Sequence, residues 1–253
     1  MYLDLKIMSR RKTPLDQEHL EPHMCDLDLR LYILSQLPFF NGLSSSMIRE
    51  INRLFVERGF DGGEIIYLEG SPASRLYVVA DGNVKLMRHT LSGKDVMLDI
   101  LKQGEFFGGL STAEDDAYSE TAHAHTPVCT LSIEGEDFRQ ILRHHPPVAM
   151  KVIDIMAQRV REAHEMVRLL SVSSVEGRLA HVLLSLGDKL GEQDKVGLLI
   201  QLPLGRADLA ELIGTTTETV SRVMSQFQKD GLIQTGRRWV AIVDKTSLAE
   251  IRD

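Results

Sequence analysis

Three side chains near the C-terminal end of this 253-residue chain form a pattern suited to reading nucleic acid. Glu218, Ser221 and Arg222 lie three and four positions apart, so a helix would place them on one face. A glutamate can accept a hydrogen bond from cytosine N4, a serine hydroxyl suits several bases, and an arginine fork matches guanine O6 and N7. Together these residues predict base recognition in a major groove.

Hydroxyl and positive groups beside the same stretch predict contacts with phosphate. Three threonines form the expected first turn of the helix: Thr215, Thr216 and Thr217. Hydroxyls and free backbone N–H groups at a helix N-terminus suit an anion. Lys229 adds positive charge, as do Arg237 and Arg238 at the tip of an expected hairpin between the strand-like runs 232–235 and 239–243. Each basic residue alone could be a solvated side chain, but the set in register favours DNA.

The residues before this stretch predict the support that a reading helix needs. Arg206–Gly214 and the helical stretch after it have the anatomy of a helix-turn-helix. Ala210 is small where two helices must cross closely, and Gly214 permits a sharp turn. Five apolar residues are spaced to fill the junction: Leu209, Leu212, Ile213, Val220 and Val223.

The N-terminal half predicts a different architecture. Glycines recur every 11 or 12 residues from position 59 to position 104, with short strand-like runs between them, and residues 118–125 and 128–133 continue the pattern. This spacing is typical of an antiparallel sandwich or barrel. We therefore expect an α+β chain with a tail at 1–30, then a double-stranded β-roll of the jelly-roll type within a domain at 31–145.

A long helix is expected next, at 146–172. Its apolar residues are spaced three and four apart and form a narrow seam: Ile153, Met156, Val160, Ala163, Val167 and Leu170. A helix that packs only on its own domain normally carries a broader stripe, so the seam favours a two-fold dimer. Ser173 and Glu176 can form a capping box for the following helix, which places the start of a C-terminal domain, the winged helix-turn-helix, at 173–253.

Composition limits the class of protein. Charged residues make up 26% of the chain, and no apolar run approaches the roughly 18 residues of a membrane span. The N-terminus lacks the apolar core of a signal peptide, so we expect a cytoplasmic protein without a membrane partner. Two cysteines, Cys25 and Cys129, are too few for a disulfide scaffold and are consistent with free thiols in a reducing compartment.

Over about residues 31–245 the chain resembles the CRP/FNR family of bacterial transcription regulators. The motifs Gly63–Gly70, Leu76–Lys85 and Gly104–Gly108, the long helix and the helix-turn-helix occur in the family's order. The resemblance implies a cyclic-nucleotide-binding-like β-roll, a dimerisation helix, and a DNA-binding domain that contacts promoters and RNA polymerase. Glu218, Ser221 and Arg222 are similar to the recognition signature of the FNR branch, which implies a TTGAT-N4-ATCAA-like site.

The resemblance is weaker at the sensor. Cyclic-nucleotide-binding members carry a glutamate for the ribose and an arginine for the phosphate, whereas this chain has Gly109 and Glu120 at those positions. An acidic side chain aimed at a phosphodiester is repulsive, so we do not expect cAMP as the effector.

A metal or redox sensor is one alternative. Cys129 matches the position of a cluster-binding cysteine of FNR, but the tail supplies only Cys25, so four cysteines cannot ligate a cluster within one chain. With His19 and His23 the two thiolates could complete a mixed site for zinc, an iron-sulfur cluster or haem iron. An unknown small ligand, or no effector at all with activity set by protein level, remains open.

A metal-dependent β-barrel enzyme of the cupin type is the rival from another class. It would use His123 and His125, which fall on one face of a strand. No acidic third ligand accompanies them, and an enzyme leaves the helix-turn-helix unexplained. A cyclic-nucleotide module serving another protein fails on Glu120 and on the same helix-turn-helix.

Overall fold

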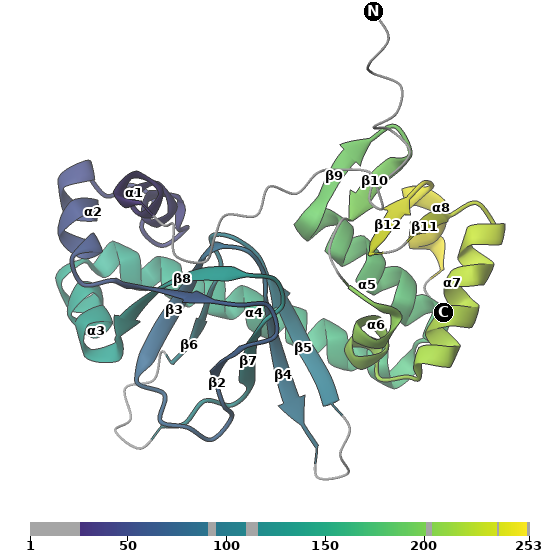
Figure 1. Ribbon diagram of the computed structural model, residues 1–253, viewed down its shortest axis with the longest axis horizontal. Helices are drawn as coiled ribbons and strands as arrows, with labels where there is room; N and C mark the ends of the chain where they lie inside the picture. Colours follow the sequence, from purple (N-terminus) through teal and green to yellow (C-terminus); the bar gives the residue numbers. More distant parts are fainter. Residues whose placement is uncertain (1–25, 91–94, 110–115, 201–203, 237, 252–253) are drawn as a thin grey trace, which may run out of the picture. The chain divides into compact units, whose positions relative to one another are not determined.

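The structure is a computed structural model that describes residues 26–90, 95–109, 116–200, 204–236 and 238–251 (Figure 1). The chain divides into two compact units, His19–Glu165 and a second unit that contains Met166–Asp253. The division falls inside one long helix, α4 (Pro146–Val172). Each unit is described by itself.

Two short helices open the first unit. They are α1 (Leu27–Gln36) and α2 (Ser45–Asn52). The side chain of Asp26 caps α1 by accepting a hydrogen bond from the Leu29 N–H at 2.8 Å. The side chain of Ser44 caps α2 in the same way, by accepting from the Met47 N–H. Helix α1 includes the last four residues, 27–30, of the expected tail.

Eight strands then form two four-stranded antiparallel sheets, which is the expected β-roll (Figure 1). One sheet has the order β1-β8-β3-β6, and its strands are β1 (Val56–Phe60), β8 (Val128–Glu134), β3 (Arg75–Asp81) and β6 (Phe106–Gly108). The other has the order β2-β7-β4-β5, and its strands are β2 (Ile65–Tyr67), β7 (Thr121–Ala124), β4 (Val84–His89) and β5 (Asp95–Leu101). The jelly-roll prediction is confirmed, although β1 and β6 were not expected.

Two apolar clusters stand out among the described residues of the first unit. One lies inside the roll and is rich in aromatic rings, including Tyr67, Phe107 and Tyr118. The other joins the roll to α1, α2 and α3 (Gly135–His144) and includes Phe39, Phe106 and Phe138. The rings of Phe39 and Phe106 meet edge to face, with centroids 5.1 Å apart. The helices are therefore part of the same core as one sheet of the roll.

Helix α4 packs on the roll along one side only. Val148 and Val152 are buried in the cluster beneath the helices, and Met156 packs partly against it. The Arg159 guanidinium donates a hydrogen bond to the Phe106 carbonyl at 2.7 Å and lies over the Phe106 ring. Most of the expected seam residues are exposed on another side: Ile153, Val160, Ala163, Val167 and Leu170. Met156 is thus shared between the roll and the seam.

In the second unit, the end of α4 is followed by α5 (Val175–Leu190), and here the expected cap is wrong by one residue. Ser174 is the N-cap, and its side chain accepts a hydrogen bond from the Gly177 N–H at 3.1 Å. The backbone N–H of Ser173 still donates to the Leu169 carbonyl, which keeps Ser173 at the end of the preceding helix. A side chain must stand one residue outside the helix to accept from its first turn, and only Ser174 does so.

The remaining elements form a small sheet and three further helices (Figure 1). The sheet has the order β11-β12-β10-β9, and its strands are β9 (Gly191–Asp194), β10 (Gly197–Ile200), β11 (Ile233–Gly236) and β12 (Trp239–Ile242). The helices are α6 (Arg206–Ile213), α7 (Thr217–Lys229) and α8 (Lys245–Glu250). The predicted helix-turn-helix and its hairpin are confirmed, whereas β9 and α8 were not predicted from the sequence. Within the described residues, no helix has the length and apolar character needed to cross a membrane.

Candidate nucleic-acid interface

The α6–α7 pair is held by a tight turn and a buried junction. Gly214 ends α6 in the left-handed conformation with φ of 64°. Directly after it, the Thr215 N–H donates to the Ala210 carbonyl at 3.0 Å. Ala210, Ile213 and Val220 are all buried, with exposures of 4%, 0% and 0%. The small residue at the crossing and the turn glycine occupy the places that the sequence predicts. Of the five predicted apolar residues, Leu209, Ile213, Val220 and Val223 are buried, whereas Leu212 is half-buried.

Helix α7 has one buried face and one exposed polar face. Val220, Val223, Met224 and Phe227 are buried. Glu218 and Arg222 are exposed, and Ser221 is half-buried between them. The apolar face fixes the rotation of α7 about its axis, so the predicted base-reading side chains are presented to solvent together.

The three threonines at the start of α7 have different roles. Thr216 is the N-cap, and its hydroxyl accepts a hydrogen bond from the Thr219 N–H at 3.2 Å and lies 2.9 Å from the Thr219 hydroxyl. Thr215 is half-buried, whereas Thr217 is exposed in the first turn. The Thr216 hydroxyl therefore orders the helix end, and that of Thr217 lies exposed in the first turn. The part of Thr219 in this cap was not predicted from the sequence.

The hairpin of β11 and β12 lies next to α7 in the chain and is hydrogen-bonded to it. The Thr235 hydroxyl donates to the Gln228 side-chain carbonyl at 3.0 Å. Lys229, in the last turn of α7, and Arg238, at the hairpin tip, are both exposed. Arg237 lies outside the described residues. Both exposed basic residues, Lys229 and Arg238, thus follow the predicted base-reading residues of α7 in the sequence.

At the cyclic-nucleotide position of the roll, Glu120 is held by neighbours from its own unit. The Tyr67 hydroxyl donates to the Glu120 carboxylate at 2.8 Å, and the Ser119 hydroxyl also donates to it. At Gly109, an added Cβ would lie 2.4 Å from the Ala73 carbonyl oxygen. A glutamate at position 109 is therefore sterically excluded unless the backbone moves, and the acidic side chain at 120 is already satisfied.

Aromatic rings pack tightly beside Glu120. The rings of Tyr67 and Tyr118 stack with centroids 3.7 Å apart, and Phe107 stacks on Tyr77 at 5.3 Å. Burial raises the pKa of Tyr118 to about 12. Burial, aided by the adjacent Glu120 carboxylate, raises the pKa of Tyr67 far above its usual range. Both phenols therefore stay neutral near pH 7, and the stacked rings of Tyr67 and Tyr118 lie beside Glu120.

The residues expected to hold a metal are only partly described. Cys129 lies on β8 with 4% of its surface exposed, and its sulfur is disulfide-bonded, which corrects the expectation of a free thiol. Cys25, His19 and His23 lie outside the described residues. Elsewhere in the described part of the chain, no three histidine, cysteine or acidic side chains are grouped to hold a metal ion.

The histidines of the rival enzyme hypothesis are set in different surroundings. His123 is half-buried on β7, and burial together with nearby Lys85 lowers its pKa. Its ring lies 6.4 Å from that of His89, between centroids, and His89 is hydrogen-bonded to Asp95 at 2.6 Å. His125 lies beyond the strand, and its backbone N–H donates to the Asn83 carbonyl. Neither histidine belongs to a described ligand group.

Comparison with known proteins identifies both units. Residues 57–145 match the cyclic nucleotide-binding domain, and residues 177–251 match the Crp-like helix-turn-helix domain. The chain is 32% identical to the cyclic AMP receptor protein of Thermus thermophilus over 85% of this chain and 96% of that protein. It is 28% identical to a CRP-like cAMP-activated global transcriptional regulator of Mycobacterium tuberculosis over 86% of this chain and 97% of that protein.

Among solved structures, the fold is similar to that of FixK2 from Bradyrhizobium japonicum, with a TM-score of 0.72 and 24% identity over 79% of this chain and 98% of that one. The matched domains and the curated relatives are those of transcription regulators rather than enzymes. The helix-turn-helix implies DNA binding. The chain belongs to the CRP/FNR family of transcription regulators.

Proposed function

We propose that this regulator acts as a homodimer that reads a TTGAT-N4-ATCAA-like palindrome through two copies of α7. The observation that carries the proposal is the joint exposure of Glu218 and Arg222 on a helix whose opposite face is buried. Arg222 would bind guanine, Glu218 would accept from the opposite strand, and Ser221 would contact a base between them. Thr217, Lys229 and Arg238 would contact the phosphates on either side.

The dimer would form along the exposed seam of α4. Ile153 is 57% exposed, Val160 52% and Val167 62%, which is unusual for apolar side chains that recur on one helix face. A second copy of the same seam, related by a two-fold axis, would bury them. Two helix-turn-helix domains related by that axis require two half-sites about one helical turn of DNA apart, which agrees with the palindrome.

The signal, we propose, is not cAMP, although relatives carry that effector in their names. Position 109 has no room for the glutamate that binds the ribose in cyclic-nucleotide-binding members. At position 120, the carboxylate of Glu120 would repel the phosphodiester. The tight stack of Tyr67 on Tyr118 favours an alternative in which the roll needs no ligand and protein level sets activity. A metal signal through the thiolates of Cys129 and Cys25 would require the Cys129 disulfide to be reduced first, whereas a redox signal could act by reducing it.

DNA reading is tested by fluorescence anisotropy with a labelled duplex that carries the palindrome and a scrambled duplex of equal length and composition. Tight binding to the palindrome and weak binding to the scrambled duplex is expected. A single change of the guanine in each half-site should weaken binding of the wild type but have little further effect on Arg222→Ala. Equal affinity for all duplexes would refute the proposal. Binding of RNA polymerase to the DNA complex, measured in the same assay, tests the proposed contact with that enzyme.

The signal is tested by calorimetry with cAMP and by an anaerobic preparation. No heat of binding is expected with cAMP, and saturable binding would overturn the steric argument at Gly109. A visible spectrum and an iron and zinc assay on protein purified without oxygen test the metal alternative. Stoichiometric metal that is lost on exposure to air would favour a sensor at Cys25 and Cys129, and metal-free protein that still binds the palindrome would favour the ligand-independent alternative.

A further inference from the structure

The tip of the hairpin formed by β11 and β12 is built around one glycine and one tryptophan. Gly236 pairs with Trp239 across the hairpin. A Cβ added to Gly236 would lie 2.1 Å from the Trp239 indole nitrogen and 2.3 Å from the adjacent ring carbon. The backbone of Gly236 is not in the left-handed region, so glycine is needed here for the close approach of the ring.

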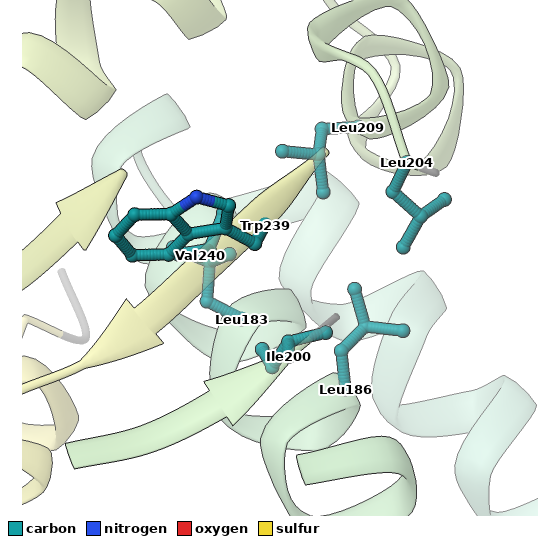
Figure 2. Close-up of a pocket in the computed structure, with 7 residues that line it drawn as sticks. All are labelled: Leu183, Leu186, Ile200, Leu204, Leu209, Trp239 and Val240. Carbon is teal, nitrogen blue, oxygen red and sulfur yellow. The ribbon is translucent and has the colours of Figure 1, made fainter. Parts of the chain in front are cut away.

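The other side of the indole faces the core of the second unit. Figure 2 shows Trp239 among the side chains that line an apolar pocket. The lining side chains come from α5, β10, α6, β12 and the segment before α6: Leu183, Leu186, Ile200, Leu209, Trp239, Val240 and Leu204. The indole therefore spans from the hairpin tip to the core that also supports the helix-turn-helix.

Between these two residues, Arg238 is held in an uncommon conformation. Its φ is 66°, and it is the only residue other than glycine with positive φ among those described. Such a conformation is disfavoured for residues that carry a Cβ, but two-residue hairpin loops favour it, so the pairing of Gly236 with Trp239 maintains it. The Arg238 side chain is exposed. The Thr235 to Gln228 hydrogen bond of 3.0 Å ties the same hairpin to α7.

We propose that Trp239 is a positioning residue for DNA binding. Its indole clamps Gly236, holds Arg238 in the left-handed conformation, and thereby aims the Arg238 guanidinium at a DNA phosphate beside the groove that α7 reads. The proposal rests on the proposed DNA-binding function and adds to it the residue that orients the hairpin. Arg238 would act through charge, so it should strengthen binding to specific and scrambled DNA alike.

The main test measures affinity for both duplexes over a range of salt concentrations. Arg238→Asn removes the charge but keeps a residue that tolerates positive φ. Loss of one phosphate contact lowers the slope of log affinity against log salt by about 1 per bound protomer. If the variant and the wild type bind equally at about 1 M salt, the variant binds about fivefold more weakly at about 0.15 M salt. Trp239→Leu keeps Arg238, yet we expect the same loss of slope, and the double variant should lose no more than Arg238→Asn alone.

A residue that only fills the core would behave differently. In that case Trp239→Leu would lower the melting temperature but keep the wild-type slope, and the proposal would be wrong. An unchanged slope in Arg238→Asn would also overturn it. Trp239→Phe, which retains an aromatic ring, should restore most of the slope.

Gly236→Ala provides a second test in case the tryptophan variants fold poorly. Its added methyl group must displace the indole, so it should reproduce the slope of Trp239→Leu in the wild-type background and have no further effect in the Trp239→Leu background. A loss in both backgrounds would contradict the clamp. Because the slope can be read on scrambled DNA, these outcomes are separate from the proposed specificity, which fails only if the wild type does not prefer the palindrome.

Discussion

Replacing Val160 by aspartate should break the proposed dimer. Val160 is 52% exposed on α4, so about half of its side chain remains to be buried by a partner. Full burial of a valine stabilises by about 1.5–3 kcal/mol, so half corresponds to about 1 kcal/mol per copy and about 2 kcal/mol per dimer. This alone weakens association about 30-fold. Two carboxylates that face each other across the two-fold axis would weaken it further.

Sedimentation equilibrium over a range of protein concentrations measures this effect directly. Gln158→Glu is the matched control, because it adds the same negative charge two residues away, about 200° around the helix, at an exposed position. The control should associate as the wild type does. Because Val160 is half-exposed in a single chain, the first unit of Val160→Asp should still fold, which circular dichroism checks. A Val160→Asp protein that dimerises as tightly as Gln158→Glu would refute the seam.

Three further predictions concern other parts of the chain. Arg222→Ala should lose about 1–3 kcal/mol of binding free energy in the anisotropy assay, mainly on duplexes with the guanine, and a uniform loss on all duplexes would contradict base reading. In the native protein at pH 11, Tyr118 and Tyr67 should remain mostly protonated because their pKa values are raised, whereas unfolded tyrosines ionise near about pH 10. Their contribution to stability should therefore be complete below about pH 10 and decline above it, and absorbance at alkaline pH in wild type and Tyr118→Phe checks this. Gly214→Ala should cost about 1 kcal/mol or more in urea unfolding because its φ is 64°, with Gly214→Asn less affected, and equal stability of all three proteins would sink that reasoning.

The helix-turn-helix could be predicted closely because the residues that determine its shape are close together in the sequence. Ala210, Gly214 and the apolar residues around them lie within a few turns of one another, so their spacing alone implied the crossing and the turn. The cap at Thr216 was less accessible, since three adjacent threonines offer equivalent hydroxyls. Only the backbone path decides which of them lies outside the helix and can accept from Thr219.

The missed elements have physical reasons of their own. Strand β6 has three residues, Phe106–Phe107–Gly108, too few to show an alternating pattern. Helix α1 has apolar residues distributed around its circumference and polar ones between them, so no single face stands out in the sequence. Its position becomes evident only from the cluster that it shares with the roll and α2.

Family membership predicts the helix-turn-helix better than it predicts the signal that the β-roll senses. A helix-turn-helix depends on many positions that all serve one shape, so a chain at 32% identity can retain it whole. An effector site depends on a few groups that meet from distant parts of the sequence. The hydrogen bond from Tyr67 to Glu120 joins residues 53 positions apart, and the Ala73 carbonyl that excludes a side chain at Gly109 lies on another segment of the roll. Under the proposed function, changes at these few positions would leave the roll and its sheets intact but remove the groups that bind a cyclic nucleotide. A β-roll with the architecture of a cAMP receptor would then respond to a different signal, or to none.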